Sequence, residues 1–238
     1  MESAGRNRIL LHKKMKKLVC LSGAGVSAES GIATFRASDG LWEKYKIEEV
    51  ATPQAWSKNP HLVTEFYNQR RRKIKEAQPN KAHLLLAQLQ KQFDVTVITQ
   101  NIDNLHERAG VQKVLHLHGE IFQKRNEHVE SEIVPCLGDQ PAEDWVNEHS
   151  RWRPNIVWFG EAVPMMEQAI PIVAAAEIFV VVGTSLMVYP AASLVEFTSP
   201  NCERFLIDIQ PPEHISTPFT TIRKPATTGM EELLSMLS

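Results

Sequence analysis

The sequence predicts an α/β fold in which a parallel sheet carries helices on both faces. Short apolar runs rich in valine and isoleucine alternate along the chain with longer stretches that have helical spacing. Runs this short and this apolar are typical of parallel strands buried on both faces. We expect strands at 17–21, 95–99, 114–117, 156–158, 178–182 and 205–209. We expect helices at 61–75, 82–90, 165–176, 191–197 and 230–237.

Two stretches interrupt this alternation. Residues 36–80 show no strand signal, and residues 120–155 are polar and irregular. The chain of 238 residues is long enough for one large domain with a lobe inserted in it. We therefore predict a single domain over residues 16–238, with a small lobe built from these two insertions. Residues 1–15 are basic and poor in acidic groups, and we expect them to be a disordered extension.

Composition narrows the possible partners and compartments. The formal net charge of −2, with no stripe of basic and aromatic residues, argues against nucleic acid as a partner. No apolar run approaches the roughly 20 residues that span a bilayer, so we expect no membrane segment. Three widely spaced cysteines, Cys20, Cys136 and Cys202, favour a reducing compartment and hence the cytoplasm. The basic N-terminus leaves import into an organelle open, and the oligomeric state is not readable.

A glycine-rich turn follows the first predicted strand and reads Gly23-Ala24-Gly25-Val26-Ser27-Ala28. Glycines let a backbone approach a pyrophosphate, and a helix that begins after the turn offers amide donors. Alone, this pattern fits an ordinary tight connection equally well. The motifs that follow in the sequence decide between the two interpretations.

The turn continues as Glu29-Ser30-Gly31-Ile32-Ala33-Thr34-Phe35-Arg36 and then Asp39-Gly40-Leu41-Trp42. Five more motifs follow in order: Thr99-Gln100-Asn101-Ile102-Asp103-Asn104-Leu105-His106, His116-Leu117-His118-Gly119, Val157-Trp158-Phe159-Gly160-Glu161, Gly183-Thr184-Ser185-Leu186 and Ile207-Asp208-Ile209-Gln210-Pro211. From about residue 17 onward the chain resembles the sirtuins. The resemblance implies a Rossmann-like sheet, NAD as cofactor, and NAD-dependent removal of acyl groups from protein lysines. The products would be nicotinamide and O-acyl-ADP-ribose.

The same resemblance implies which residues form the NAD and catalytic sites. The implied NAD-binding residues are Gly23, Ala24, Gly25, Ala28, Thr34, Phe35, Arg36, Gln100, Asn101, Ile102, Asp103, Gly183, Thr184, Ser185, Asp208, Ile209, Gln210 and Ala226. The implied catalytic residues are His118, Asn101 and Asp103. His118 would be the general base, a role that suits a group whose pKa is near neutrality. A lone histidine is more often a hydrogen-bonded core residue, and it is the motif that favours catalysis.

The implied substrates are acylated-lysine proteins or peptides. The segment Val157, Trp158, Phe159, Gly160 and Glu161 resembles the one that pairs with the substrate backbone as an added strand. Binding through the main chain would make sequence selectivity modest.

Acyl selection depends on Tyr67 and Arg70, which are three residues apart and therefore share a helix face. They resemble the pair that reads the distal carboxylate in the succinyl- and malonyl-lysine-removing branch of the sirtuins, where a small residue also stands near the position of Ala51. This predicts removal of succinyl and malonyl groups, and also of acetyl groups. The run Arg70-Arg71-Arg72-Lys73 fits a solvated basic helix face as well.

One departure from the family concerns zinc. Most sirtuins carry two Cys-x-x-Cys pairs between the catalytic histidine and the Trp-Phe-Gly segment. Here residues 119–155 contain only Cys136, and His128 and His149 have no partner at chelating spacing. We expect no zinc, and we expect Ile133, Trp145 and Trp152 to form an apolar cluster that stabilises the small lobe instead.

Two alternative functions stay open at this stage. A protein ADP-ribosyltransferase or an NAD hydrolase would use the same pocket, because the same glycosidic bond is activated for another nucleophile. A catalytically idle NAD-sensing or interaction module is the other alternative, and the retention of His118, Asn101 and Asp103 argues against it.

Overall fold

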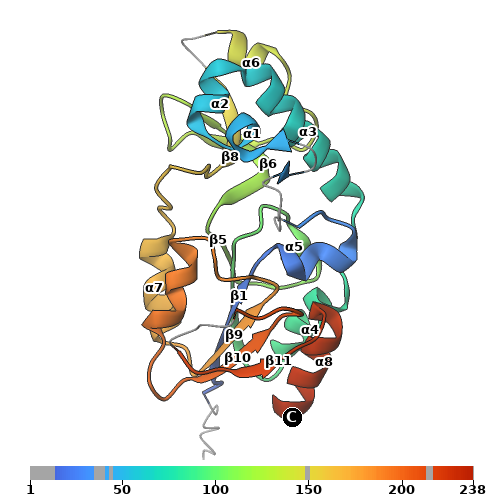
Figure 1. Ribbon diagram of the computed structural model, residues 1–238, viewed down its shortest axis with the longest axis vertical. Coiled ribbons are helices and arrows are strands. Elements are labelled where there is room, and N and C mark those ends of the chain that lie inside the picture. The colour runs from blue at the N-terminus through green and yellow to red at the C-terminus, as the bar shows by residue number, and fades with distance from the viewer. Residues whose placement is uncertain (1–13, 35–40, 43–44, 148–150, 213–216, 238) are drawn as a thin grey trace, which may run out of the picture.

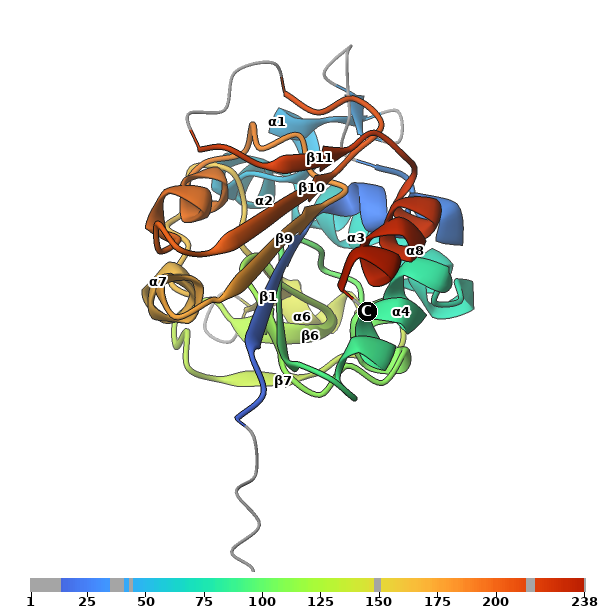
Figure 2. The ribbon, with the colours of Figure 1, turned by 90° about the horizontal axis from the view of Figure 1, so that it is seen from below.

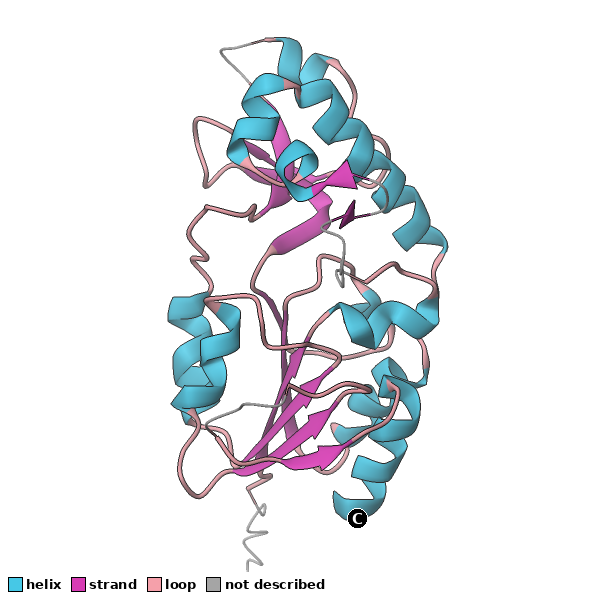
Figure 3. Cartoon of the chain, viewed as in Figure 1, coloured by secondary structure: helices cyan, strands magenta, loops and turns pink. Residues whose placement is uncertain are grey.

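The computed structural model describes residues 14–34, 41–42, 45–147, 151–212 and 217–237. A six-stranded parallel sheet in the order β11-β10-β9-β1-β4-β5 forms its base (Figures 1 and 3). The strands are β1 (Lys17–Ser22), β4 (Asp94–Thr99), β5 (Val114–His116), β9 (Ile178–Val182), β10 (Glu203–Ile207) and β11 (Thr220–Ile222). The α/β fold class is therefore confirmed. The extension predicted for residues 1–15 falls almost entirely outside the described residues.

Helices cover both faces of this sheet (Figure 2). Helices α4 (Lys81–Leu89) and α8 (Ala226–Leu237) pack on one face, and α7 (Met166–Ala174) packs on the other with the 3-10 helix η2 (Ala191–Phe197). The side chains of β1 alternate between the two resulting cores: Leu18 and Cys20 enter the first, while Val19 and Leu21 enter the second. A strand buried on both faces explains why β1 reads as a continuous apolar run.

Above the carboxyl ends of the strands lies a second body, which we call the small lobe (Figure 1). Its helices are α1 (Ile47–Val50), α2 (Pro53–Lys58), α3 (Pro60–Glu76) and α6 (Glu143–Val146), and its antiparallel sheet has the order β7-β6-β8. The strands are β6 (Gly119–Asn126), β7 (Ile133–Pro135) and β8 (Trp152–Ile156), and a short hairpin is made by β2 (Leu41–Trp42) and β3 (Tyr45–Lys46). A third apolar core, separate from the other two, joins these helices to the small sheet.

Helix α3 determines what the small lobe presents to the sheet. The Asn59 side chain accepts a hydrogen bond from the amide of Leu62 at 3.0 Å, and Pro60 occupies the first turn, so the N-terminus is capped in the usual way. Residues at helical spacing along one face are buried, including Tyr67 and Arg70. The burial pattern fixes the face on which these two side chains lie.

One local prediction is wrong, one needs refinement and one strand was missed. Residues 156–158 do not form a parallel strand, because β8 is antiparallel to β6 and ends at Ile156, and the chain then leaves the sheet. The helix expected at residues 191–197 is present with these bounds and is a 3-10 helix. Strand β11 was not expected, because two of its three residues are exposed threonines that carry no apolar signal. None of the described helices is both long enough and apolar enough to cross a membrane.

Candidate active site

A cavity of about 490 Å³ lies between the edge of the large sheet and the small lobe. The loops that follow β1, β4, β9 and β10 line it from the sheet side, and α3 and residues 156–161 line it from the small-lobe side. Parallel α/β sheets bind ligands at the carboxyl ends of their strands, because the loops and helix N-termini there leave main-chain groups available. The cavity therefore lies where the topology alone would place a site.

Two of the strand-end loops pack directly on each other. The amide of Gly25, in the 3-10 helix η1 (Ala24–Ser30), donates to the carbonyl of Gly183 after β9 at 2.8 Å. A Cβ on Gly25 would lie 2.7 Å from Gly183 Cα, and one on Gly23 would lie 2.7 Å from Thr184 Cβ. Gly183 has φ +63°, a conformation that favours glycine. The glycines are thus required by loop-to-loop packing, a reason that the sequence did not reveal.

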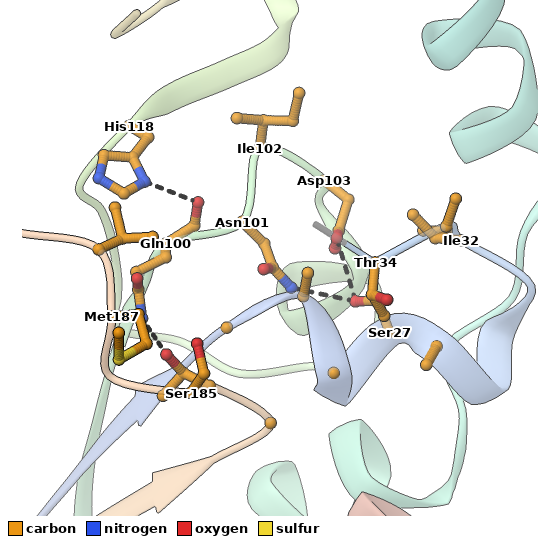
Figure 4. A pocket seen from close by; sticks show the side chains of 18 of the residues that line it. Ser27, Ile32, Thr34, Gln100, Asn101, Ile102, Asp103, His118, Ser185 and Met187 are labelled. Carbon is orange, nitrogen blue, oxygen red and sulfur yellow. Dashed lines mark hydrogen bonds between the residues drawn. The ribbon is translucent and has the colours of Figure 1, made fainter. Parts of the chain in front are cut away.

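A buried hydrogen-bond network follows β4 (Figure 4). The Asn101 side-chain amide donates to Ser27 Oγ at 3.1 Å, and the Ser27 hydroxyl donates to Asp103 Oδ2 at 3.0 Å. The other oxygen of Asp103 accepts from the amide of Leu105 at 3.1 Å. Burial raises the pKa of the Asp103 carboxyl, and these hydrogen bonds partly offset the shift. Asn101 and Asp103 are therefore held in one arrangement through Ser27.

Two buried histidines contact this network through Ser27 and Asn101. His83 Nε2 lies 3.4 Å from Ser27 Oγ, and burial lowers the pKa of His83 to about 4, so its ring is neutral. His116 Nδ1 lies 2.9 Å from the Asn101 carbonyl, and its Nε2 lies 2.7 Å from Glu107. Burial alone would lower the pKa of His116, but the Glu107 carboxylate raises it overall. Both the side chain and the backbone of Asn101 are consequently anchored.

His118 lies between β5 and β6 and lines the cavity. Its Nδ1 lies 3.0 Å from the carbonyl of Gln100 (Figure 4). A carbonyl only accepts hydrogen bonds, so in the neutral ring Nδ1 carries the proton and Nε2 carries the lone pair. Burial lowers the pKa of His118 below its usual 6.5, although the bond to Gln100 partly offsets this. His118 is therefore a neutral proton acceptor at physiological pH.

Most of the residues that the sequence assigned to NAD line this one cavity. They are Gly23, Ala24, Gly25, Ala28, Thr34, Gln100, Asn101, Ile102, Asp103, Gly183, Thr184, Ser185, Asp208, Ile209 and Ala226. Gln210 is exposed and does not line it; its amide instead donates to Asp208 Oδ1 at 2.8 Å. Phe35 and Arg36 lie outside the described residues.

Tyr67 and Arg70 line the cavity from α3, together with Ala51 and Trp158. Tyr67 is 0% exposed and Arg70 is 5% exposed, and the Arg70 guanidinium carbon lies 5.8 Å from the centroid of the Phe66 ring. The interpretation of Arg70 as part of a solvated basic face is therefore wrong. The solvated part of that basic run begins at Arg72, whose side chain is 48% exposed.

The segment Val157–Glu161 also lines the cavity, but its main-chain donors are largely used within the protein. The amide of Val157 donates to the His118 carbonyl at 2.9 Å, and that of Phe159 donates to the Ala51 carbonyl at 3.0 Å. The amide of Trp158 donates to the Glu161 carboxylate at 2.8 Å. A substrate strand would have to use the carbonyls of this segment and the amide of Gly160.

Glu161 is held by arginine. Arg153 donates to its two carboxylate oxygens at 2.6 and 3.0 Å, and Arg125 approaches to 3.4 Å. Burial alone would raise the pKa of the Glu161 carboxyl, but Arg153 lowers it below its usual value. Glu161 therefore stays ionised and shapes the segment around Trp158.

Comparison with known proteins shows the family to which this chain belongs. The family model described as the Sir2 family matches residues 23–190. The chain belongs to the Sir2 family. An NAD-dependent protein deacylase of Bacteroides thetaiotaomicron is 49% identical over 230 residues, covering 94% of this chain and 98% of the relative. One of Helicobacter pylori is 48% identical over 224 residues, covering 94% and 98%.

Solved Sir2 structures superpose on the whole fold. A Sir2 homologue in complex with NAD matches with a TM-score of 0.83 and 38% identity, covering 94% of this chain and 90% of its own. A Sir2 complex with a p53 peptide and NAD+ matches with a TM-score of 0.76 and 29% identity, covering 93% of each chain. The predicted sirtuin family is thus confirmed.

Polar contacts supplement the apolar core in the small lobe of this Sir2 chain. Among the described residues, no three histidine, cysteine or acidic side chains form a metal site, and His149 lies outside those residues. The Asn68 side chain donates to the Gln140 carbonyl at 3.1 Å and accepts from the Gln140 amide at 2.8 Å. Lys124 pairs with Asp144 at 2.7 Å. These contacts tie the segment before α6 to α3, and α6 itself to β6.

The predicted apolar cluster is only partly present. Trp145 packs against the third core as expected. Ile133 does not, because it is 47% exposed on the edge strand β7. Trp152 lies outside that core, and the Lys124 ammonium stands 5.4 Å from its ring centroid.

Sequence reasoning missed several residues at this Sir2 site. Ser27 lies within the glycine motif, and a serine in a buried turn was the available signal. No pattern in the sequence marked His83, because only the tertiary fold brings α4 against η1. Met187 and Tyr189 line the cavity from the loop after β9, and their side chains are 74% and 70% exposed.

Proposed function

We propose that this chain is an NAD-dependent protein-lysine deacylase that prefers succinyl and malonyl groups and also removes acetyl groups. The observation that carries the proposal is that one cavity is lined both by the NAD-assigned residues with His118 and by Tyr67 and Arg70. Relatives that are nearly half identical over almost the whole chain are NAD-dependent protein deacylases. The substrates would be proteins or peptides that carry acylated lysines.

NAD in this site would supply the ribose carbon to which the acyl oxygen is transferred, with nicotinamide as leaving group. The loops at Gly23–Gly25 and Gly183–Ser185 offer main-chain amides and hydroxyls to the phosphates and riboses. Asn101 and Asp103, anchored through Ser27, hold the nicotinamide ribose in position. His118, neutral and with its lone pair on Nε2, accepts a proton from a ribose hydroxyl.

Acyl selection rests on charge. The Arg70 guanidinium presents a planar fork of donors to a carboxylate, and Tyr67 adds a hydroxyl. In a pocket where Tyr67 is fully buried and Arg70 nearly so, little water competes for the ligand. Such a charge-assisted pair contributes roughly 1.5–3 kcal/mol. An acetyl group has no distal carboxylate to pair with Arg70 or Tyr67, so acetyl-lysine would be a less efficient substrate.

The test is mass spectrometry of one peptide carried in unmodified, acetylated, malonylated and succinylated forms, incubated with and without NAD. We expect acyl loss only with NAD, one nicotinamide released per acyl group removed, and kcat/KM larger for the succinyl and malonyl forms. NAD consumption that is equally fast with the unmodified peptide would overturn the proposal in favour of ADP-ribosyl transfer or NAD hydrolysis. Equal efficiency on all acyl forms would overturn the stated preference alone.

A further inference from the structure

The backbone and the side chain of Trp158 lie in different surroundings. Its backbone belongs to the segment that lines the cavity, while its indole turns inward and is 2% exposed. The indole N–H donates to the hydroxyl oxygen of Tyr67 at 3.0 Å. This bond joins the substrate-lining segment to the helix that carries the acyl-reading pair.

The direction of this hydrogen bond is unambiguous. An indole nitrogen has a proton and no available lone pair, so it can only donate. The Tyr67 hydroxyl must therefore be the acceptor, and its own proton must point to a different partner. Within the part of the chain that the structure describes, no protein group accepts that proton, although Tyr67 lines the cavity. The cavity that Tyr67 lines is where a bound group can supply that acceptor.

Packing against neighbouring side chains fixes the orientation of the Trp158 indole. The Arg153 guanidinium carbon lies 3.3 Å from the Trp158 ring centroid, and Trp56 packs at 5.9 Å between centroids. Arg153 is itself fixed by Glu161 and by the carbonyl of Ile156 at 2.9 Å. A stacked, ion-paired guanidinium holds an aromatic ring in one orientation.

We infer that Trp158 is a specificity-determining positioning residue, which commits the Tyr67 hydroxyl to donate into the acyl end of the cavity. Tyr67 and Arg70 then both present donors to an acyl group that ends in an acceptor. Without the indole N–H, the hydroxyl is free to rotate, and the pocket loses part of its discrimination for a carboxylate. The inference rests on the proposed function, because it deepens the acyl preference stated there.

The test compares two tryptophans of the same core. Trp158→Phe keeps an aromatic ring and removes the donor. Trp56→Phe is the matched control, because the Trp56 indole nitrogen is buried and makes no hydrogen bond to any described residue. The measured quantity is the ratio of kcat/KM on succinyl-lysine to kcat/KM on acetyl-lysine peptide, in which any loss common to both substrates cancels.

We expect Trp158→Phe to lower this ratio about three- to tenfold, the factor that one neutral hydrogen bond supports. The change should lie mainly in KM for the succinyl peptide. Trp56→Phe should leave the ratio within about twofold of the unmodified protein. Equal shifts in the two variants would overturn the inference, because they would mean that only packing has been disturbed.

A double-mutant cycle isolates the route through Tyr67. In a Tyr67→Phe background no hydroxyl remains to be oriented, so adding Trp158→Phe should change the ratio by less than about twofold. A full three- to tenfold shift in that background would show that Trp158 acts by another route. Failure of the proposed function looks different, because the unmodified protein would then show no succinyl preference for any variant to lose.

Discussion

The large sheet and the small lobe face the same cavity, but they hold their residues there by different means. On the sheet side, short loops at strand ends carry Asn101, Asp103 and His118, which are positioned by main-chain and neutral side-chain hydrogen bonds. On the small-lobe side, Tyr67 and Trp158 are positioned by arginine ion pairs and stacked aromatic rings. The first arrangement follows from the sheet topology, whereas the second depends on particular side chains.

This difference teaches how the two halves should respond to substitution. Under the proposed function, groups held by the backbone of strand ends would perform a reaction that is the same for every acyl group. Under the proposed function, groups held by side chains of the small lobe would select which acyl group is removed. Changes on the sheet side should alter turnover for all substrates, and changes on the small-lobe side should alter the ratio between substrates.

The largest expected effect is on the sheet side. His118→Ala should lower kcat on every acyl peptide by about 10²–10⁴-fold, the usual contribution of a general base. NAD affinity, measured by calorimetry, should change by less than about threefold, because the ring accepts a proton and its loss leaves the strand-end loops in place. Turnover above about a tenth of the unmodified level would rule out the assignment of His118 as the base.

The next effect is on the small-lobe side. Arg70→Met should lower the succinyl-to-acetyl ratio of kcat/KM by about ten- to a hundredfold, because a charge-assisted pair worth roughly 1.5–3 kcal/mol is lost. The matched control is Arg72→Met, which removes the same charge two residues further along α3 from an exposed side chain. Equal losses on both substrates after Arg70→Met would mean that Arg70 supports only the fold.

A third effect separates the halves by pH. The pKa of His118 is lowered below 6.5. The neutral, basic form of its ring is therefore lost only when the pH falls through that lowered pKa. With acetyl-lysine peptide, whose acyl group does not titrate, kcat/KM should be level near pH 7.5 and should fall toward tenfold per pH unit below that pKa. An acid limb centred above pH 7 would contradict a buried, neutral His118, provided that circular dichroism shows an intact fold.

The smallest expected effect is none. A strong chelator should leave both the melting temperature and the activity unchanged, because the contacts seen in the small lobe are hydrogen bonds and ion pairs such as Asn68 with Gln140 and Lys124 with Asp144. Elemental analysis of the purified protein checks the same point. About one zinc per chain, with a lowered melting temperature after chelation, would show a metal site that the described residues do not reveal.

Much of the sheet side was predictable from the sequence. Strands such as β1 and β9 are buried on both faces, so their apolar runs are continuous and their ends are marked by glycine or polar residues. The small lobe was harder to predict, because its sheet is half-buried and strand β6 carries charged residues among its apolar ones. Residues 156–158 illustrate the limit: Ile156 ends the antiparallel strand β8, and Val157 and Trp158 line the cavity outside any strand.

The sequence by itself determined the fold class, the family and the strand-end residues of the site, because these depend on local patterns and on motifs that are contiguous along the chain. Only the tertiary structure decided that Arg70 is buried while Arg72 is solvated, and that Gln210 lies outside the cavity. It alone brought His83 behind Ser27, Arg153 onto Trp158 and the Trp158 indole to the Tyr67 hydroxyl. His83 and Ser27 are 56 residues apart in the sequence, and Trp158 and Tyr67 are 91 residues apart, so no local periodicity connects them. Their contacts depend on how separate helices and strands pack, and that packing minimises buried apolar and unpaired polar surface over the whole chain at once.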